Sequence, residues 1–402
     1  MKKFFSLALA VILILLTVNY ADAEEKSEPE KIKFNKKMLR QTELIESGAR
    51  DVPMMILRGS PEDVTIFGEP VASREQMVNF IKKRNPAPKI NCTVEELVDF
   101  YYEEAGREGI RPDIAICQSI KETGTWNYGG DVVPEQNNYC GLGTTGGGVK
   151  GAYFETPQLG VRAQIQHLLA YTSTEPPQLE IVDPRYELIQ KHRPQIFGQI
   201  KTWTGLNGVW AVPGKRYGHE ILNLWQQAQL PDASDASLEY AYEQLAKNPD
   251  AAAYVYRGLV YFAQENYYGA QSDFKNALRL EPELPEALFN LALTQEKLQL
   301  TTAAIETYDK FLELRPESDY AYYNRGRLKL AQKKYNAAIR DFHYALDIEG
   351  RFADAQNEIA VAHFRQKKYE DALKDIRTAA KINTTNKVIN ENLERLEACV
   401  KK

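Results

Sequence analysis

The stretch QSIKETGTW, residues 118–126, is a helix-like run that a glycine, Gly124, would end. Glu122 stands in the last turn of that expected helix. It is followed by PEQNNYCGLG, residues 134–143, which leads into a segment with six glycines between residues 141 and 151. A carboxyl group at a helix end, beside a glycine-rich loop and several aromatic residues, suits the cleavage of a sugar polymer.

The sequence around this stretch predicts a mainly α domain. Residues 73–229 have mostly helical periodicity, and Thr93 and Glu96 have the spacing of a capping box. Pro112 fits the first turn of the helix that carries Glu122. The glycine-rich segment predicts an irregular loop or a small hairpin, before another helix from about residue 158 to residue 171.

A strict repeat follows residue 232. Small residues recur 34 apart (292 − 258 = 34) at Gly258, Ala292, Gly326 and Ala360. Larger residues recur in the same phase at Phe274, Tyr308, Phe342 and Ile376. Small residues let two helices approach closely while large ones fill the gap, so each unit is a helix pair that buries its face by stacking on its neighbours. The units are expected at 251–284, 285–318, 319–352 and 353–386, within an array that spans 235–400 and ends in a capping helix at 387–400.

This array resembles the tetratricopeptide repeat family. The resemblance implies an α-solenoid with a groove that binds a protein or peptide partner. The first-helix positions expected to face that groove are Val255, Phe289, Tyr323 and Asn357. A groove built mainly of apolar groups suits an amphipathic helix or an extended apolar peptide.

Residues 65–230 resemble the glucosaminidase domain of bacterial cell-wall hydrolases, glycoside hydrolase family 73. The matching stretches are residues 113–115 through 122–124, residues 136–139 with 141–143, residues 160–168, and residues 210–214 with 217–218. The resemblance implies a lysozyme-like α+β domain in which Glu122, the glutamate before Thr-Gly, is the general acid.

Hydrolysis of a glycosidic bond needs a carboxylic acid that is protonated near neutral pH. The negative end of its helix and partial burial would both raise the pKa of Glu122. The resemblance places Tyr217 near the same site and Asn138 and Tyr139 in the sugar groove, where a purely structural turn is the alternative. Gln118 and His167 complete the candidate substrate-binding residues, although a lone histidine on an apolar face is also typical of a hydrogen-bonded core residue.

The second catalytic group is open. Many members of the family present a second carboxylate on the hairpin after the catalytic helix, but residues 141–152 contain no Asp or Glu. The nearest candidates are Asp131, Glu135 and Glu155. Either one of these acids positions a water or attacks the sugar, or the substrate's own 2-acetamido group assists while Tyr217 stabilises the charge.

The amino-terminal residues predict export. Residues 1–23 have the basic start, apolar middle and A-x-A end of a signal peptide. Their apolar stretch is shorter than the ~20 residues that span a bilayer, so we expect cleavage, no membrane span afterwards, and a location in the periplasm, the cell envelope or the extracellular space. Residues 24–64 are rich in Glu and Lys without sustained periodicity, which predicts a flexible leader.

Composition argues against several other functions. The formal net charge of −5 disfavours nucleic acid as a partner. The four cysteines lack metal-ligand spacing, so neither a metal nor another cofactor is expected. Cys117 and Cys140 flank the proposed site and are either a disulfide or two buried thiols.

The sequence therefore predicts an exported endo-acting hydrolase that cuts the β-1,4 bond after N-acetylglucosamine in the glycan strands of peptidoglycan. The repeat array would bind another protein. Two alternatives remain. A lytic transglycosylase would also use a single glutamate but would leave an anhydro product. A non-catalytic scaffold would use the first domain only to grip glycan, and the missing hairpin carboxylate favours it.

Overall fold

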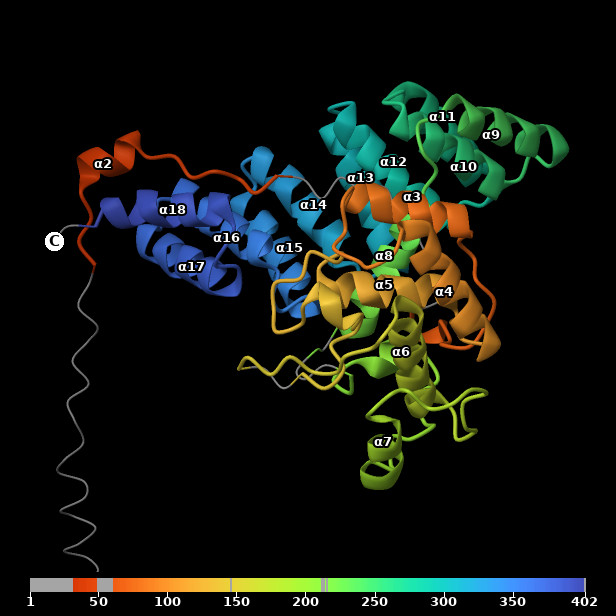
Figure 1. Cartoon of the computed structure of the whole chain (residues 1–402). Helices are drawn as coiled ribbons and strands as arrows, with labels where there is room; N and C mark the ends of the chain where they lie inside the picture. The colour runs from red at the N-terminus through yellow and green to blue at the C-terminus, as the bar shows by residue number, and fades with distance from the viewer. Residues whose placement is uncertain (1–31, 49–60, 145–146, 211–213, 215, 401–402) are drawn as a thin grey trace, which may run out of the picture. The chain divides into compact units, whose positions relative to one another are not determined.

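The computed structural model describes residues 32–48, 61–144, 147–210, 214 and 216–400. The expected signal peptide lies outside these residues. The chain divides into two compact units, residues 48–355 and residues 1–47 with 356–402. The described residues are mainly helical (Figure 1), which confirms the fold class expected from the sequence.

The larger unit begins with the helices of the glucosaminidase-like part. These are η1 (Pro61–Asp63), α3 (Arg74–Arg84), α4 (Val94–Arg107), α5 (Pro112–Thr123), η2 (Pro134–Gln136), α6 (Pro157–Thr172), α7 (Tyr186–His192), η3 (Thr204–Leu206) and α8 (Tyr217–Ala228). The expected β component consists, in this part of the described chain, of the isolated bridges Thr65↔Thr202 and Phe67↔Ile110. The glycine-rich segment is an irregular loop in its described residues.

Helix α5 lies in the core of this part, in contact with α3, α4 and α8. Pro112 occupies its first turn, and every residue from Pro112 to Ile120 is buried. Gly124 ends the helix in the left-handed conformation, φ 59°, as the sequence predicts. At the other end, Asp113 accepts hydrogen bonds from the backbone N–H groups of Val71 and Ala72 and from the indole of Trp225. These bonds fix the helix, so the position of its last turn is fixed as well.

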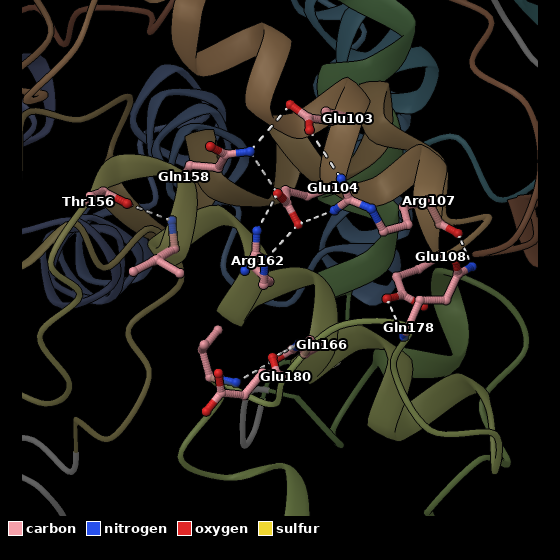
Figure 2. A network of polar contacts seen from close by, with 12 residues as sticks. Glu103, Glu104, Arg107, Glu108, Thr156, Gln158, Arg162, Gln166, Gln178 and Glu180 are labelled. Atoms are coloured by element: carbon pink, nitrogen blue, oxygen red, sulfur yellow. Dashed lines mark hydrogen bonds and ion pairs between the residues drawn. The ribbon is translucent and has the colours of Figure 1, made fainter.

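Helices α4 and α6 are joined by an ion-pair network around Glu104, which is 2% exposed. Figure 2 shows Arg162 and Gln158 of α6 and Arg107 of α4 pointing toward its carboxylate. The guanidinium of Arg162 donates two hydrogen bonds to it, at 2.9 and 3.0 Å. Burial alone would raise the pKa of Glu104, but the hydrogen bonds and positive charges hold it below its usual value. Arg162 lies in one of the family-like stretches, and here it holds two helices together.

The rest of the larger unit is the repeat array. Its helices are α9 (Asp235–Lys247), α10 (Ala251–Ala263), α11 (Tyr267–Leu280), α12 (Pro285–Lys297), α13 (Thr301–Leu314), α14 (Asp319–Ala331) and α15 (Tyr335–Ile348). The two helices of a repeat touch where a recurring small residue meets a recurring large one. A Cβ added at Gly258 would lie 2.7 Å from the ring of Phe274. The same distance separates a Cβ at Gly326 from the ring of Phe342. The repeat registers of the sequence are therefore the contact points of each helix pair.

The smaller unit contains most of α16 (Ala353–Arg365), together with α17 (Tyr369–Ile382), α18 (Lys387–Ala398) and a short helix, α2 (Lys36–Gln41). The presence of α2 corrects the expectation of a flexible leader for residues 32–47. Leu39 and Leu44 are buried, and the backbone of Asn35 donates a hydrogen bond to the carbonyl of Cys399 at 2.7 Å. Apolar burial and backbone pairing order a segment whose composition predicts disorder.

The cysteines of the chain are unpaired in this structure. Cys92, Cys117, Cys140 and Cys399 are all free thiols, so Cys117 and Cys140 are buried separately rather than joined. Burial raises the pKa of both of these thiols well above its usual value. Across the described ranges, each helix is too short or too polar to cross a bilayer.

Candidate active site

Glu122 lies in the last turn of α5 and lines two cavities. One has a volume of about 510 Å³ and is lined by Glu122 together with residues of the 123–132 turn and Asn138, Gly141 and Thr144. The other has a volume of about 570 Å³ and is lined by Lys121, Glu122, Tyr217 and, from the end of α15 and the loop that follows it, residues 347–351. The carboxyl group is thus half-buried at the edge of open space, where a large polar ligand has access to it.

A chain of hydrogen bonds, each donating toward the site, ends on the Glu122 carboxyl. The hydroxyl of Tyr101 donates to Oε1 of Gln164 at 2.6 Å, and Nε2 of Gln164 donates to Oε1 of Gln118 at 2.9 Å. Nε2 of Gln118 then donates to the hydroxyl of Tyr217 at 3.0 Å, and that hydroxyl donates to Oε1 of Glu122. The Tyr217 hydroxyl accepts a hydrogen bond from Gln118, so its own proton is directed toward the carboxyl of Glu122.

The electrostatic surroundings favour a protonated Glu122. Burial raises the pKa of its carboxyl above the usual value. The hydrogen bond from Tyr217, the charge of Lys121 and an interaction with the Trp210 side chain each oppose that shift without cancelling it. Lys121 is itself paired with Glu220, which limits the positive charge that acts on the site. A carboxyl group whose pKa is raised in this way keeps its proton to a higher pH than an exposed glutamic acid does.

An aromatic group backs the site. The rings of Trp210 and Tyr217 are stacked, with centroids 6.3 Å apart and planes 14° apart. His167 packs edge-on against Trp210 at 4.8 Å, and its Nδ1 is 2.8 Å from Oδ2 of Asp183. His167 is buried and lines neither cavity. In this structure His167 packs against Trp210 and Asp183 holds its ring, so its contact with substrate stays a prediction.

Two other candidate substrate-binding residues are also buried. Gln118 is 0% exposed and lines neither cavity. Its side chain is instead a member of the hydrogen-bond chain that ends on Glu122. Tyr139 is 1% exposed, with its ring in the hydrophobic core. Both side chains lie away from the two cavities, because every residue of α5 from Pro112 to Ile120 is buried and Tyr139 packs in the core, so their contact with substrate stays a prediction.

Asn138 has both a structural and a cavity-lining position. Its amide donates to the carbonyl of Leu142 at 2.9 Å and accepts from the backbone N–H of the same residue at 2.9 Å. The residue also lines the cavity of about 510 Å³ that contains Glu122. Asn138 therefore shapes the loop that forms one wall of this cavity.

The structure separates the three candidates for the second carboxylate. Asp131 lines the same cavity as Glu122, and its Oδ1 accepts a hydrogen bond from the backbone N–H of Gly148 at 3.0 Å. Glu135 and Glu155 are exposed and line neither of the two cavities. Of the three candidates, Asp131 is the one that lines a cavity together with Glu122.

Glycines of the family-like stretches hold these pieces in contact. A Cβ added at Gly160 would lie 1.8 Å from the carbonyl oxygen of Asn137. A Cβ at Gly218 would lie 2.1 Å from the carbonyl oxygen of Trp203. Only glycine allows backbone to approach so closely at these two points, which place Asn138 and Tyr217.

Sequence reasoning missed Trp210, Gln164 and Tyr101 as parts of the site. Trp210 and Gln164 lie within stretches that carry the family resemblance, and that position was the available signal. Tyr101 lies on α4, and nothing in its local sequence indicates the bond to Gln164. Residues 211–213 of the final family-like stretch lie outside the described residues.

Comparisons with known families agree with this architecture. Residues 98–230 match the model of the glucosaminidase family, described as mannosyl-glycoprotein endo-beta-N-acetylglucosaminidase. Residues 257–319 and 321–386 match a tetratricopeptide repeat model. The chain is thus a glucosaminidase-family domain, a glycan-hydrolase-like fold, followed by a repeat array of the kind that binds proteins.

A more specific relationship connects the chain to a protein of known sequence. The chain belongs to the same family as an uncharacterized protein of Borreliella burgdorferi, with 32% identity over 160 residues, which cover 40% of this chain and 70% of that protein.

Solved structures similar to the chain are tetratricopeptide repeat proteins. YrrB, described as a TPR protein with an unusual peptide-binding site, has 22% identity and a TM-score of 0.37, and the match covers 39% of this chain and 81% of that one. A MamA fragment from Desulfovibrio magneticus has 18% identity and a TM-score of 0.32, with 42% and 86% covered. A protein of Thermus thermophilus has 14% identity and a TM-score of 0.33, with 41% and 90% covered.

Proposed function

We propose that this protein is an exported endo-β-N-acetylglucosaminidase that hydrolyses the β-1,4 bond after N-acetylglucosamine in peptidoglycan. One observation carries the proposal. Glu122 is held at the edge of two cavities with its pKa raised by burial, and a directed hydrogen bond from Tyr217 fixes its orientation. The glucosaminidase-family match supports the substrate class.

In the proposed reaction, Glu122 donates its proton to the glycosidic oxygen as that oxygen leaves the sugar ring. Positive charge then develops at the anomeric carbon. Tyr217 holds the carboxyl by its hydrogen bond and stabilises the carboxylate that proton transfer leaves behind. The stacked rings of Trp210 and Tyr217 complete the apolar side of the site.

Asp131 is the second carboxylate in this proposal. It lines the cavity that Glu122 also lines, and the N–H of Gly148 holds one of its oxygens. From this position it orients the water that attacks the sugar, or attacks the sugar itself. Assistance by the substrate's own 2-acetamido group is the alternative route, in which Asp131 is dispensable and Tyr217 stabilises the charge.

Product analysis distinguishes hydrolysis from the transglycosylase alternative. Purified protein is incubated with defined peptidoglycan, and the released fragments are examined by mass spectrometry before and after borohydride reduction. We expect fragments with a plain reducing N-acetylglucosamine end, which gain two hydrogens on reduction. Anhydro ends would instead indicate a lytic transglycosylase. Binding to the cell wall without release of fragments would favour the non-catalytic scaffold.

The repeat array is proposed to bring the hydrolase to another protein of the cell envelope. The repeat family match supports a protein or peptide partner. Export is supported by the amino-terminal sequence pattern of residues 1–23. Recovery of the protein outside the cytoplasm, with residue 24 as its first residue by amino-terminal sequencing, would test this part of the proposal.

A further inference from the structure

Residues 43–47, with the sequence ELIES, lie against α16 and α18 of the smaller unit as a non-helical segment. Asn392 binds both polar backbone groups of Ile45: its Oδ1 accepts from the N–H at 2.7 Å, and its Nδ2 donates to the carbonyl at 2.7 Å. Such a pair of bonds to a single residue recognises the peptide backbone independently of the side chain.

The contacts continue along the segment. Nδ2 of Asn357 donates to the carbonyl of Ile45 at 3.1 Å and to the hydroxyl of Ser47 at 3.0 Å. The N–H of Ser47 donates to Oε1 of Glu358 at 2.5 Å. Alternate residues of the segment thus have their N–H groups bound by α18 and by α16.

The residues that bind this backbone are set by the repeat. Glu358 and Asn392 are 34 apart (392 − 358 = 34), and the same register holds polar residues at Asn290 and Asn324. Asn357, Glu358 and Asn392 are each 0% exposed. Buried polar side chains of this kind need hydrogen-bonding partners, and in this unit residues 45 and 47 supply several of them. The helices therefore form a built site for an extended peptide.

Side chains of the segment add chemical specificity. Leu44 is buried against the unit, whereas Glu46 is partly exposed and forms an ion pair with Arg365 at 2.6 Å. Arg395 donates to the carbonyl of Glu43 at 2.8 Å. The bound peptide thus presents an aliphatic side chain to an apolar position and an acidic side chain to an arginine.

We propose that residues 43–47 are an internal occupant of the peptide groove, and that the groove's external ligand is an extended peptide of the same chemistry. That ligand has an aliphatic residue followed two positions later by an acidic one, and it binds by displacing the occupant. The proposal deepens the protein-binding role given above to the repeat array, and it is independent of hydrolysis. Partner binding and release of residues 43–47 are then the same event.

A labelled peptide tests the proposal. Fluorescein-labelled TELIESG, the sequence of residues 42–48, is titrated with the full-length protein and binding is followed by anisotropy. The test variant is Ile45→Pro, which lacks the N–H that Asn392 accepts and lies outside any helix. Glu43→Ala is the matched control, because the observed contact of Glu43 uses its backbone carbonyl.

We expect Ile45→Pro to bind the peptide about tenfold more tightly than the wild type, because it weakens the internal competitor. Glu43→Ala should bind like the wild type, and adding Asn392→Leu to Ile45→Pro should abolish binding. If Ile45→Pro is misfolded by circular dichroism, Leu44→Asp replaces it, since it removes the buried contact instead.

Three results would overturn the proposal. Equal affinity of wild type and both release variants would show that the groove binds peptide but that residues 43–47 do not compete, which leaves the binding role intact. Absence of binding to every protein would remove the binding role as well. A wild-type dimer that the peptide dissociates in light scattering would assign the segment to a second copy of the chain.

Discussion

Replacement of Tyr217 by phenylalanine tests how the site controls its general acid. The hydroxyl of Tyr217 donates to Oε1 of Glu122, and this bond favours the ionised carboxylate, so it lowers the pKa that burial raises. Tyr217→Phe removes that bond and leaves the burial, and the pKa of Glu122 rises further. A general acid works only while it is protonated, so activity is present below this pKa and is lost as pH rises through it.

The size of the effect follows from the hydrogen bond. A bond to a charged group contributes roughly 1.5–3 kcal/mol, and about 1.4 kcal/mol corresponds to one pKa unit. Because the carboxyl lines two cavities, the lower end of this range applies, and the falling limb of the pH profile should move to higher pH by about one unit. We expect the maximal rate to fall as well, since the carboxylate formed by proton transfer loses its donor.

The assay is the rate of muropeptide release as a function of pH. Tyr171→Phe is the matched control: Tyr171 packs against the same Trp210 and His167, and within the described residues its hydroxyl makes no hydrogen bond to Glu122. Its falling limb should stay in place. A limb that is unmoved in Tyr217→Phe, or that shifts to lower pH, would refute the assignment of Glu122 as the titrating acid held by Tyr217.

Two further predictions concern the second carboxylate and the fold. Asp131→Asn should lower the maximal rate by at least about 100-fold if the Asp131 carboxylate positions the attacking water or attacks the sugar in its place. The control Glu155→Gln, at an exposed residue, should have the wild-type rate. A fully active Asp131→Asn would instead support assistance by the substrate's acetamido group. Arg162→Met should lower the free energy of unfolding near neutral pH by about 3 kcal/mol in urea titrations, because it leaves the buried Glu104 carboxylate underpaired. The pKa of Glu104 is lowered in the folded protein, so the stabilisation by the ion pair is present above the unfolded-state pKa and is lost as pH falls through the folded-state pKa. An equal loss of stability in Arg162→Met at acid pH would argue against the ion pair as the source of the effect.

Local patterns predicted much of the fold. The capping box at Thr93 and Glu96, the first-turn Pro112 and the terminal Gly124 all occur as the sequence predicts, because each depends on residues within one helical turn. The repeat array could be predicted from the sequence for a similar reason. Each unit contacts mainly its neighbours, so one register of residues repeats one contact.

The burial of individual site residues was not predictable in the same way. Gln118 and Tyr139 lie in stretches that resemble a sugar groove, yet the three-dimensional packing of α5 and the following turn buries both. The ordered conformation of residues 43–47 was also not predicted. Ile45 is 347 residues from its partner Asn392, and the composition of a segment indicates only its own tendency to be ordered or disordered. The in-phase Asn324, Glu358 and Asn392 were the available signal, and they recur in a register that does not follow apolar periodicity.

The most direct measurement of the central claim is peptidoglycan digestion by Glu122→Gln beside the wild type. Glutamine keeps the shape of the side chain and can still accept the hydrogen bond from Tyr217, but it has no proton to donate. We predict that the variant keeps its thermal unfolding temperature and its binding to cell walls while muropeptide release falls by at least about a thousandfold. Release at the wild-type rate by the folded variant would contradict the account.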